Sequence, residues 1–339
     1  YLVALPGATA ARRRGRPAFP DPEPVPNQHR FRRQNTGHGD PERCGRARPM
    51  MLDPDLTRTW LFGPGADRAA HDAMERSGAD ALIVDLEDFT PPDRRAAARD
   101  GLAALLQRWR SAGCLVAVRI NALGADGAED LAAAMPARPD VVAYPMAARA
   151  AQMQSLHEAV TRWERTLGIA EGATGILPVC ETALGVADVR AIAAASNRIR
   201  AALLGAEDLA ADLCAERSPE AVELDYARRR FVLECRAAGI EPIDAPYTFS
   251  DAEGAVHEAR YARRLGYRCK SLVRPDHARP LNAALTPNED DVRRAKAIVE
   301  AARARGEDRA LVDGLWVEVP TYRSAQRLID RARRLGQRG

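Results

Sequence analysis

Short apolar runs alternate with longer amphipathic stretches from Thr59 to about residue 285. The runs are rich in Val, Ile, Leu and Ala and have no polar face, as expected for parallel strands buried on both sides. Most are followed by apolar residues at helical spacing, such as Leu102, Leu105, Leu106 and Trp109. We therefore predict eight strands, at residues 59–62, 81–86, 115–120, 141–144, 175–179, 201–204, 239–243 and 269–273.

Eight strand-then-helix units predict an α/β fold of the (β/α)8 TIM barrel type. The alternative is a doubly wound open sheet, which usually has five or six strands and a G-x-G-x-x-G turn after the first. The chain has eight predicted strands and no such turn. A barrel carries its chemistry at the carboxyl ends of its strands, so the residues that follow each apolar run are the candidates for function.

The segment 286–339 is predicted to form a C-terminal helical lid that follows a barrel over residues 51–285. Thr286-Pro287-Asn288-Glu289 has the pattern of a helix start, with a threonine cap, a proline in the first position and a glutamate three residues after the cap. Asp313-Gly314 predicts a turn between two helices, either in a mobile lid or as an ordinary surface turn. The helices are expected to bury Val292, Ala295, Ile298, Val299 and Ala302, then Ala325, Leu328, Ile329, Ala332 and Leu335.

Residues 1–50 differ in composition from the rest of the chain. They contain Arg12-Arg13-Arg14 and five prolines between Pro17 and Pro26, without a helical or alternating period. An arginine-rich, acid-poor start resembles an organelle transit peptide. We favour a disordered or wrongly included leader, with the true start at Met50 or Met51.

The overall charge and composition exclude several classes of function. The formal net charge of the 339 residues is +3, which is too balanced to favour nucleic-acid binding. No apolar run reaches the length of about 18 residues that a membrane-spanning helix needs. The six cysteines lack C-x-x-C spacing, so we interpret them as free thiols in a reducing cytosol. We expect a cytoplasmic protein that acts on small molecules.

Two carboxylates at the ends of neighbouring predicted strands indicate a metal site. Glu181 follows the fifth apolar run, and Asp208 follows the sixth. Neighbouring strands lie about 4.8 Å apart, so acids at their ends can share one ion. Mg²⁺ typically takes one or two protein carboxylates and leaves its other positions to water and substrate. The alternative is that either acid caps the following helix. Glu207 is a weaker candidate because adjacent strand residues point to opposite sides.

The ends of the second and third runs bring more acids and one arginine to the same region. Arg119 ends the third run, where a guanidinium can hold a carboxylate or stabilise an enolate oxygen, or can pair with a neighbouring acid such as Glu87. Asp85, Glu87 and Asp88 are expected to orient Arg119 or metal-bound water. We assign substrate binding to Arg119, Gly205, Ala206 and Arg68. A Gly-Pro-Gly run precedes Arg68, so backbone amides there can approach a ligand closely and Arg68 can meet a phosphate; the alternative is an ordinary turn.

Residues from about 58 to 336 resemble the citrate lyase beta subunit and its relatives, the malyl-CoA and citramalyl-CoA lyases of the HpcH/HpaI aldolase superfamily. The resemblance rests on eight short runs that occur in the order found in the family. These are residues 58–65, 85–88, 118–121, 181–185, 205–209, 243–247, 265–267 and 312–314.

The resemblance implies Mg²⁺, with Mn²⁺ as the alternative ion, on Glu181 and Asp208, and Arg119 at the oxyanion of a 2-oxo acid or thioester enolate. It also implies a lid whose Asp313 reaches a neighbouring subunit as acid or base, in a homotrimer or hexamer. Two positions depart from the family pattern: Met146 stands where a lysine is usual, and Arg274 where a histidine is usual. Arg274 adds a fixed positive charge that can receive a phosphate or a second carboxylate.

The leading functional interpretation is a Mg²⁺-dependent carbon–carbon lyase that cleaves a 3-hydroxyacyl-CoA of the malyl, citramalyl or citryl type to acetyl-CoA and a 2-oxo acid. A class II 2-oxo acid aldolase without CoA is the second, although the expected histidine base after the second strand is missing. Thioester hydrolysis or Claisen condensation on the same scaffold is the third. A non-catalytic subunit of a lyase complex is the fourth.

Overall fold

The computed structural model describes residues 53–304 and 310–336, which fall into two compact units that meet in sequence after Thr286. The first unit is a closed barrel of eight parallel strands in sequence order, with β8 pairing back onto β1. The strands are β1 Thr59–Pro64, β2 Ala81–Asp85, β3 Leu115–Arg119, β4 Val141–Tyr144, β5 Gly175–Cys180, β6 Ala201–Leu204, β7 Glu241–Asp244 and β8 Cys269–Leu272. The predicted TIM barrel is confirmed, and the predicted strand ends differ from the observed ones by at most two residues.

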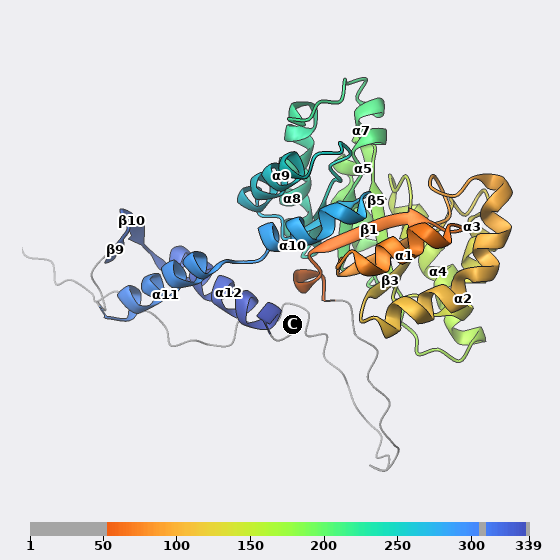
Figure 1. Ribbon diagram of the computed structural model, residues 1–339, viewed down its shortest axis with the longest axis horizontal. Helices are drawn as coiled ribbons and strands as arrows, with labels where there is room; N and C mark the ends of the chain where they lie inside the picture. The colour runs from red at the N-terminus through yellow and green to blue at the C-terminus, as the bar shows by residue number, and fades with distance from the viewer. Residues whose placement is uncertain (1–52, 305–309, 337–339) are drawn as a thin grey trace, which may run out of the picture. The chain divides into compact units, whose positions relative to one another are not determined.

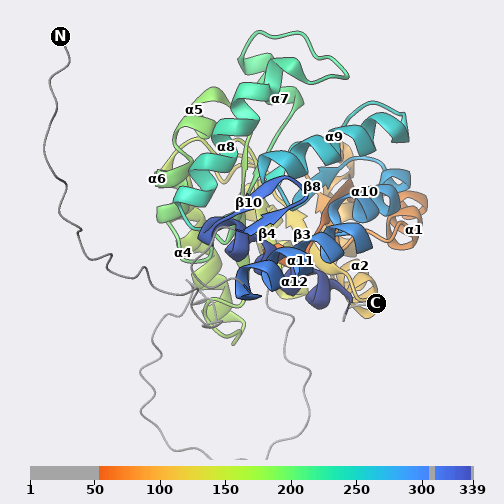
Figure 2. The same ribbon diagram turned by 90° about the vertical axis from the view of Figure 1, so that its left-hand side faces the viewer.

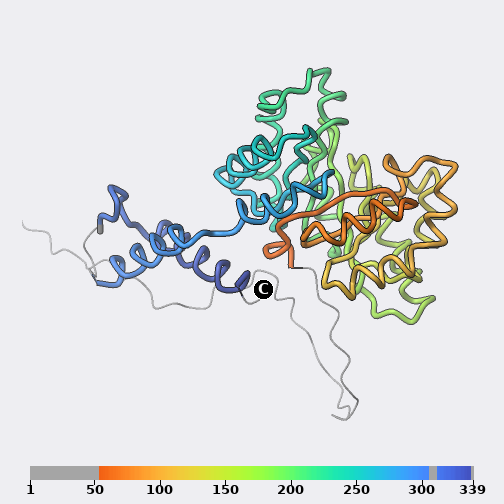
Figure 3. The backbone as a smooth tube through the Cα atoms, in the orientation of Figure 1, coloured from red at the N-terminus to blue at the C-terminus, as the bar shows by residue number. Residues whose placement is uncertain are grey.

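Helices connect consecutive strands and lie outside them (Figures 1 and 2). The tube in Figure 3 shows the same alternation along the chain. The α-helices of this unit are α1 Arg68–Arg76, α2 Arg95–Ser111, α3 Gly127–Ala134, α4 Ala150–Thr166, α5 Ala183–Ala187, α6 Val189–Ala194, α7 Glu207–Asp212, α8 Asp225–Ala237, α9 Ala252–Leu265 and α10 Ala278–Leu285. Short 3₁₀ turns are η1 Pro54–Leu56, η2 Pro92–Arg94, η3 Met135–Ala137, η4 Val222–Leu224 and η5 Pro275–His277.

The strands are apolar on both faces because each face packs against a different apolar layer. Alternate residues point outward to the helices, and the others fill the barrel interior. In β2 and β3 the inward series ends in Asp85 and Arg119, which are register partners across the two strands. Polar side chains therefore close the carboxyl end of an apolar interior formed by Trp60, Phe62, Ala81, Ile83, Leu115, Ala117, Val141, Ala143, Leu177, Val179, Ala201, Leu203, Ile243 and Cys269.

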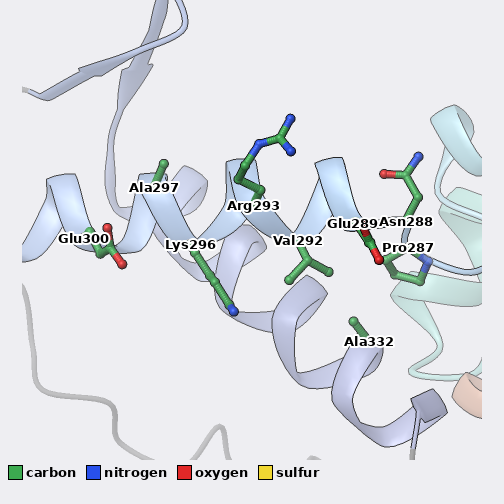
Figure 4. A pocket seen from close by; sticks show the side chains of 9 residues that line it. All are labelled: Pro287, Asn288, Glu289, Val292, Arg293, Lys296, Ala297, Glu300 and Ala332. Atoms are coloured by element: carbon green, nitrogen blue, oxygen red, sulfur yellow. The ribbon is translucent and has the colours of Figure 1, made fainter.

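The second unit contains two helices, α11 Glu289–Ala304 and α12 Val319–Gly336, and a hairpin of β9 Ala310–Val312 and β10 Leu315–Val317. Its core is apolar. An open groove of about 640 Å³ is lined by residues of both helices. In Figure 4, Val292 of α11 and Ala332 of α12 point toward one another across this groove. The core residues are Ala295, Ile298, Val299, Ala302, Val317, Tyr322 and Ala325.

Two predictions for this segment are wrong in detail. Thr286 does not cap α11, because its hydroxyl donates to the Asn282 carbonyl at 2.7 Å and it terminates α10. Asn288 caps instead, since its Oδ1 accepts from the backbone N–H of Asp291 at 2.8 Å. The Asp313-Gly314 turn closes a β-hairpin that we did not predict. Both turn residues have positive φ, 48° and 76°, as the two-residue turn of a hairpin requires.

Three expectations from the composition concern membrane-spanning helices, the cysteines and the N-terminal leader. Within them, no helix combines the length and the apolar character needed to cross a membrane. None of the five cysteines in these ranges forms a disulfide. The leader predicted for residues 1–50 lies outside the described residues.

Candidate functional site

A bidentate ion pair between Arg119 and Asp85 lies at the carboxyl end of the barrel. Arg119 Nε donates to Asp85 Oδ1 at 2.8 Å, and Nη2 donates to Oδ2 at 2.5 Å. Both side chains are almost inaccessible, with relative exposures of 7% for Arg119 and 0% for Asp85. The pair joins the ends of β2 and β3, so it fixes the guanidinium plane at the barrel mouth.

The loop after β2 adds two more acids to the same guanidinium. Glu87 Oε2 lies 2.8 Å from Nη1, and Asp88 Oδ2 lies 3.1 Å from Nη2. The ion pair expected between Arg119 and Glu87 is thus present, although Asp85 is the principal partner. The Phe62 ring lies 5.2 Å from the guanidinium carbon on another side. These contacts restrict Arg119 to one orientation at the mouth.

Asp85 is itself held by the backbone of the loop that it precedes. Its Oδ1 accepts from the Glu87 N–H at 2.9 Å, and its Oδ2 accepts from the Phe89 N–H at 3.2 Å. The Thr90 hydroxyl donates to the Asp85 carbonyl and accepts from the Gly65 N–H at 2.7 Å. Two backbone N–H groups and the Arg119 guanidinium fix the orientation of this buried carboxylate, so Asp85 acts as a rigid support for Arg119.

Glu181 immediately follows β5 and points into the same mouth. It is 4% exposed, and its Oε1 accepts from the Met146 backbone N–H at 2.7 Å. A Cβ placed on Gly205 would lie 2.4 Å from Glu181 Cβ and 2.8 Å from Oε2, so only glycine fits there. Thr182, not Glu181, caps α5 by accepting from the Gly185 N–H at 3.0 Å. Glu181 Oε1 is thus engaged by Met146, while Oε2 receives no hydrogen bond from the described residues.

The sequence analysis placed Asp208 at the end of the sixth strand, and this prediction is wrong. The strand ends at Leu204, and Asp208 lies in the first turn of α7, where it is exposed. It makes no capping bond to that helix, whose N-cap position is Ala206. Glu207 is engaged elsewhere, since its Oε1 accepts from Thr248 Oγ1 at 2.7 Å and Arg217 Nε at 3.1 Å.

Several acids surround one guanidinium at the mouth, and the pKa values of three of these acids are raised. Burial raises the pKa of Glu87 to about 8, with Asp88 and Glu181 adding to the shift and Arg119 opposing it. Burial also raises the pKa of Glu181 to about 7, against the Met146 N–H and Arg119. Although Asp208 is exposed overall, its pKa is raised by partial desolvation of the carboxyl and by the charge of Asp88. The mouth thus carries more negative charge than one guanidinium neutralises.

This arrangement fits a divalent cation that prefers oxygen ligands. Glu181 and Asp208 are electrostatically coupled across the mouth, and the described residues donate no hydrogen bond to Oε2 of Glu181. No group of three or more His, Cys, Asp or Glu side chains in residues 53–304 and 310–336 is arranged to hold a metal ion. A two-carboxylate site is the pattern typical of Mg²⁺, which keeps several waters and uses the substrate for its remaining ligands.

The other predicted substrate-binding residues lie near the mouth but make different contacts. Gly63 and Gly65 are explained by packing, because a Cβ would lie 2.2 Å from Met74 Sδ at the first position and 2.7 Å from Ala98 Cβ at the second. Arg68 is the exposed first residue of α1. Ala206 is buried at 3% exposure. Packing thus accounts for the lack of a side chain at these two glycines, and the close approach of a ligand to their backbone stays a prediction.

Asp313 belongs to the second unit, at the turn of the hairpin. It is exposed, and its Oδ2 lies 3.3 Å from Arg294 Nε of α11. The neighbouring hairpin residues Leu311, Leu315 and Trp316 are 55%, 49% and 55% exposed, respectively. Asp313 is therefore an exposed acid at the tip of a hairpin with exposed apolar side chains, and its role as acid or base stays a prediction.

Sequence reasoning missed two contributors to the site. Phe62 flanks Arg119 and is the inward neighbour of Trp60, two residues earlier in β1, so the alternation of the strand contained this signal. Met146 contributes only its backbone N–H, which every residue except proline offers. No sequence pattern marks such a contact.

Replacing Glu181 by glutamine is expected to stabilise the metal-free protein at high pH. The folded-state pKa of Glu181 is about 7 against an ordinary value of 4.5, so the folded state holds this proton more tightly than the unfolded state. Stability therefore falls as pH rises from about 4.5 to about 7, and the neutral amide avoids that loss. At pH 8.5 the free energy of unfolding of Glu181→Gln should exceed that of the wild type by up to about 3 kcal/mol.

Urea unfolding in EDTA at pH 5 and pH 8.5 measures this difference. The two proteins should converge at pH 5, where the carboxyl is largely protonated in the folded state. Equal stability at both pH values would show that Glu181 does not carry the buried charge described here.

Comparisons with known proteins agree with the geometry. Residues 58–275 match the model of the HpcH/HpaI aldolase/citrate lyase family. The citrate lyase subunit beta of Haemophilus influenzae is 33% identical over 283 residues, covering 82% of this chain and 97% of the relative. The L-malyl-CoA/beta-methylmalyl-CoA lyase of Cereibacter sphaeroides is 31% identical over 300 residues, covering 81% of this chain and 94% of the relative.

A solved structure gives the same result. The protein CitE of Mycobacterium tuberculosis, in complex with magnesium, acetoacetate and coenzyme A, is 28% identical to this chain and superimposes with a TM-score of 0.67. The match covers 82% of this chain and 98% of that one. Because the family model matches more than half of the chain and the H. influenzae relative is 33% identical over 82% of it, the chain belongs to the HpcH/HpaI aldolase/citrate lyase family.

Proposed function

We propose that the protein is a Mg²⁺-dependent carbon–carbon lyase that cleaves a 3-hydroxyacyl-CoA to acetyl-CoA and a 2-oxo acid. The observation that carries this proposal is the excess of carboxylates around Arg119, with raised pKa values at Glu87 and Glu181. A divalent cation and an oxyanionic substrate complete such a site. The magnesium and coenzyme A bound by the M. tuberculosis relative support the same chemistry.

Glu181 and Asp208 are the residues that would hold the ion. Glu181 supplies a buried, fixed oxygen, and Asp208 supplies an exposed one, so water and substrate retain access from the side of Asp208. When bound, the ion polarises the substrate carbonyl and holds the adjacent carboxylate. Gly205 leaves the space that Glu181 needs to take its position.

The reaction breaks the bond between C2 and C3 of the acyl group. A base removes the proton of the 3-hydroxyl group, the C3–O bond becomes a carbonyl, and the electron pair of the C2–C3 bond moves to C2 as a thioester enolate. Protonation of C2 then yields acetyl-CoA, while C3 leaves as the 2-oxo carbonyl carbon of the acid, an aldehyde from the malyl group and a ketone from the citramalyl or citryl group. Atoms and electrons balance without an external oxidant or reductant.

Arg119 is suited to the negative charge that develops in this reaction. Its guanidinium is held at the mouth by Asp85 at 2.8 and 2.5 Å, so no reorganisation is needed as charge moves onto oxygen. Asp85 is a positioning residue. Asp88, which is exposed, contacts Arg119 at 3.1 Å and can move aside when a substrate oxyanion arrives.

Two acids are candidates for moving the proton. Burial raises the pKa of Glu87 to about 8 against the charge of Arg119, so its carboxyl can take up and release a proton close to neutral pH. Asp313 is proposed to act as acid or base in the mouth of a neighbouring subunit, within a homotrimer or hexamer. This assignment follows the family resemblance and the position of Asp313 at an exposed hairpin tip.

Purified protein supplied with Mg²⁺ should release acetyl-CoA and a 2-oxo acid from at least one of malyl-, citramalyl- and citryl-CoA. Excess EDTA should stop the reaction. Asp208→Ala should lower kcat/KM about a hundredfold, because water replaces an exposed Mg²⁺ ligand imperfectly. The matched control is Glu207→Ala, which removes the adjacent carboxylate that contacts Arg217 and Thr248.

The products distinguish the competing functions. Free CoA without a 2-oxo acid would indicate a thioesterase. Cleavage of free 4-hydroxy-2-oxo acids, without turnover of any thioester, would indicate an aldolase. Equal losses in Asp208→Ala and Glu207→Ala would remove Asp208 from the metal site.

A further inference from the structure

The loop after β4 holds the proposed metal ligand Glu181 through an unusual backbone conformation. The Met146 N–H donates to Glu181 Oε1 at 2.7 Å. Met146 has a φ of 47°, in the left-handed region that residues with a Cβ rarely adopt. Such a conformation persists only where the surroundings impose it. Neighbouring residues must therefore hold Met146 in this conformation.

Two contacts fix the peptide group that follows Met146, one at its carbonyl and one at its N–H. Gln152 Nε2, in the first turn of α4, donates to the Met146 carbonyl at 3.1 Å. On the far side of that peptide, the Ala147 N–H donates to the Val179 carbonyl of β5 at 2.9 Å. Ala147 is fully buried. The peptide between Met146 and Ala147 is thus held by a side chain at one atom and by a strand at the other.

We propose that Gln152 is a positioning residue for the metal site, acting on Glu181 through the Met146 backbone. The inference rests on the proposed function. Holding the Met146 carbonyl keeps the N–H of the same residue directed at Glu181 Oε1. Because Oε1 accepts this N–H, Oε2 is the oxygen left for an ion, and the missing side chain of Gly205 leaves the carboxylate room for that position. Partners of this kind, one step beyond the ligand, determine how rigidly a metal site is preformed.

Gln152 also has a second role, and the two roles use different atoms. Its Oε1 accepts from the backbone N–H groups of Ala148 and Arg149, both at 2.8 Å, and so caps the start of α4. Its Nε2 alone reaches Met146. Gln152→Glu keeps acceptor oxygens for the cap and removes the donor. Gln152→Met removes both functions at similar size and helix propensity.

Direct binding of Mn²⁺, measured from the electron paramagnetic resonance signal of the free ion, tests the proposal without relying on turnover. Gln152→Glu and Gln152→Met should each weaken Mn²⁺ binding about tenfold. The added charge of Gln152→Glu by itself would attract a cation, so a weakened affinity runs against the simple charge effect. Gln154→Glu is the matched control, because it places the same charge on an exposed position of the same helix. It should bind Mn²⁺ within about twofold of the wild type.

Turnover at saturating Mg²⁺ separates positioning from a general structural defect. Gln152→Glu should recover most of the wild-type kcat there, since only the affinity for the ion is affected. Wild-type affinity in Gln152→Glu, with loss only in Gln152→Met, would overturn the proposal and leave Gln152 as a helix cap. Absence of Mn²⁺ binding by the wild type would overturn the metal assignment as well as the positioning role, whereas unaffected variants of a Mn²⁺-binding wild type would overturn the positioning role alone.

Discussion

Arg119→Met should lower kcat/KM about a thousandfold and also destabilise the protein. Preorganised donors at a developing oxyanion each contribute about 10²- to 10³-fold, and Arg119 is the guanidinium that contacts the acids of the mouth. Its removal leaves Asp85 buried at 0% exposure without its bidentate partner. Breaking a buried ion pair from one side costs about 3–5 kcal/mol in the free energy of unfolding. Steady-state kinetics and urea unfolding measure the two effects.

A second buried ion pair in the same barrel separates the catalytic loss from the structural one. Arg198 and Glu164 form a comparably buried bidentate pair, with side-chain exposures of 2% and 0%. Arg198 also donates to the carbonyl of Thr174, which directly precedes β5. The pair therefore lies at the amino end of the strands, opposite the mouth. Arg198→Met should destabilise the protein similarly but leave kcat/KM within about threefold at a temperature where the protein is folded.

Arg119→Lys adds a variant that keeps the charge. Lysine cannot reproduce the planar fork that engages both oxygens of Asp85, so activity should fall even though the net charge of the mouth is unchanged. If Arg119→Met and Arg198→Met lost activity in parallel with stability, Arg119 would have a structural role only.

The barrel was predictable because burial on both faces leaves a strong trace in the sequence. Strands such as β4, Val141–Tyr144, have no polar residue that a half-exposed strand would need. The hairpin of the second unit was not predicted, since its strands have only three residues each. The Asp-Gly pair flanked by apolar residues was nevertheless a usable hairpin signal.

The sequence pattern predicted the wrong capping residue for α11, because tertiary contacts decide between two residues that could each cap it. Thr286 and Asn288 both offer a capping side chain close to the start of α11. The hydroxyl of Thr286 is engaged by the Asn282 carbonyl and by Arg58, whose Nη1 donates to it at 2.9 Å. Arg58 lies 228 residues away in the sequence, so no local rule can include this contact.

The site was predictable in its residue types but not in its geometry. Runs of acids and one arginine after apolar strands indicated which side chains meet at the mouth. The role of each side chain depends on contacts that have no pattern in the sequence, such as the hydrogen bond from the Met146 backbone N–H to Glu181. The position of Asp208 on α7 was missed because residues 201–206 are all apolar, which hides the end of the strand at Leu204.

Gly205→Ala should abolish metal-dependent activity by adding one methyl group. The new Cβ would lie 2.4 Å from Glu181 Cβ, which is closer than two carbon atoms can approach without movement. Glu181 Cβ belongs to a residue fixed at the end of β5, so the carboxylate must be displaced rather than bent aside. The bound ion would stabilise the transition state by several kcal/mol. Without it we expect kcat/KM to fall about a thousandfold.

The expected defect is in binding the ion, and it should appear before any chemistry is measured. Gly205→Ala should bind Mn²⁺ at least about a hundredfold more weakly than the wild type while keeping its circular dichroism spectrum. Gly101→Ala is the matched control, because Gly101 lies within α2 and a Cβ there meets nothing within 4 Å. That substitution should raise the free energy of unfolding by about 0.5–1 kcal/mol and leave Mn²⁺ binding unchanged.

The comparison of these two glycines distinguishes a steric role from a general effect of replacing glycine. If Gly205→Ala bound Mn²⁺ as tightly as the wild type, Glu181 would not need the position in which the structure places it. The ion would then have to be held by Asp208 together with an acid of the loop after β2, and Glu181 would become a neighbour of the site. Tight binding combined with lost turnover would instead place Gly205 against the substrate, because the same methyl group would then obstruct the acyl group and not the metal ligand.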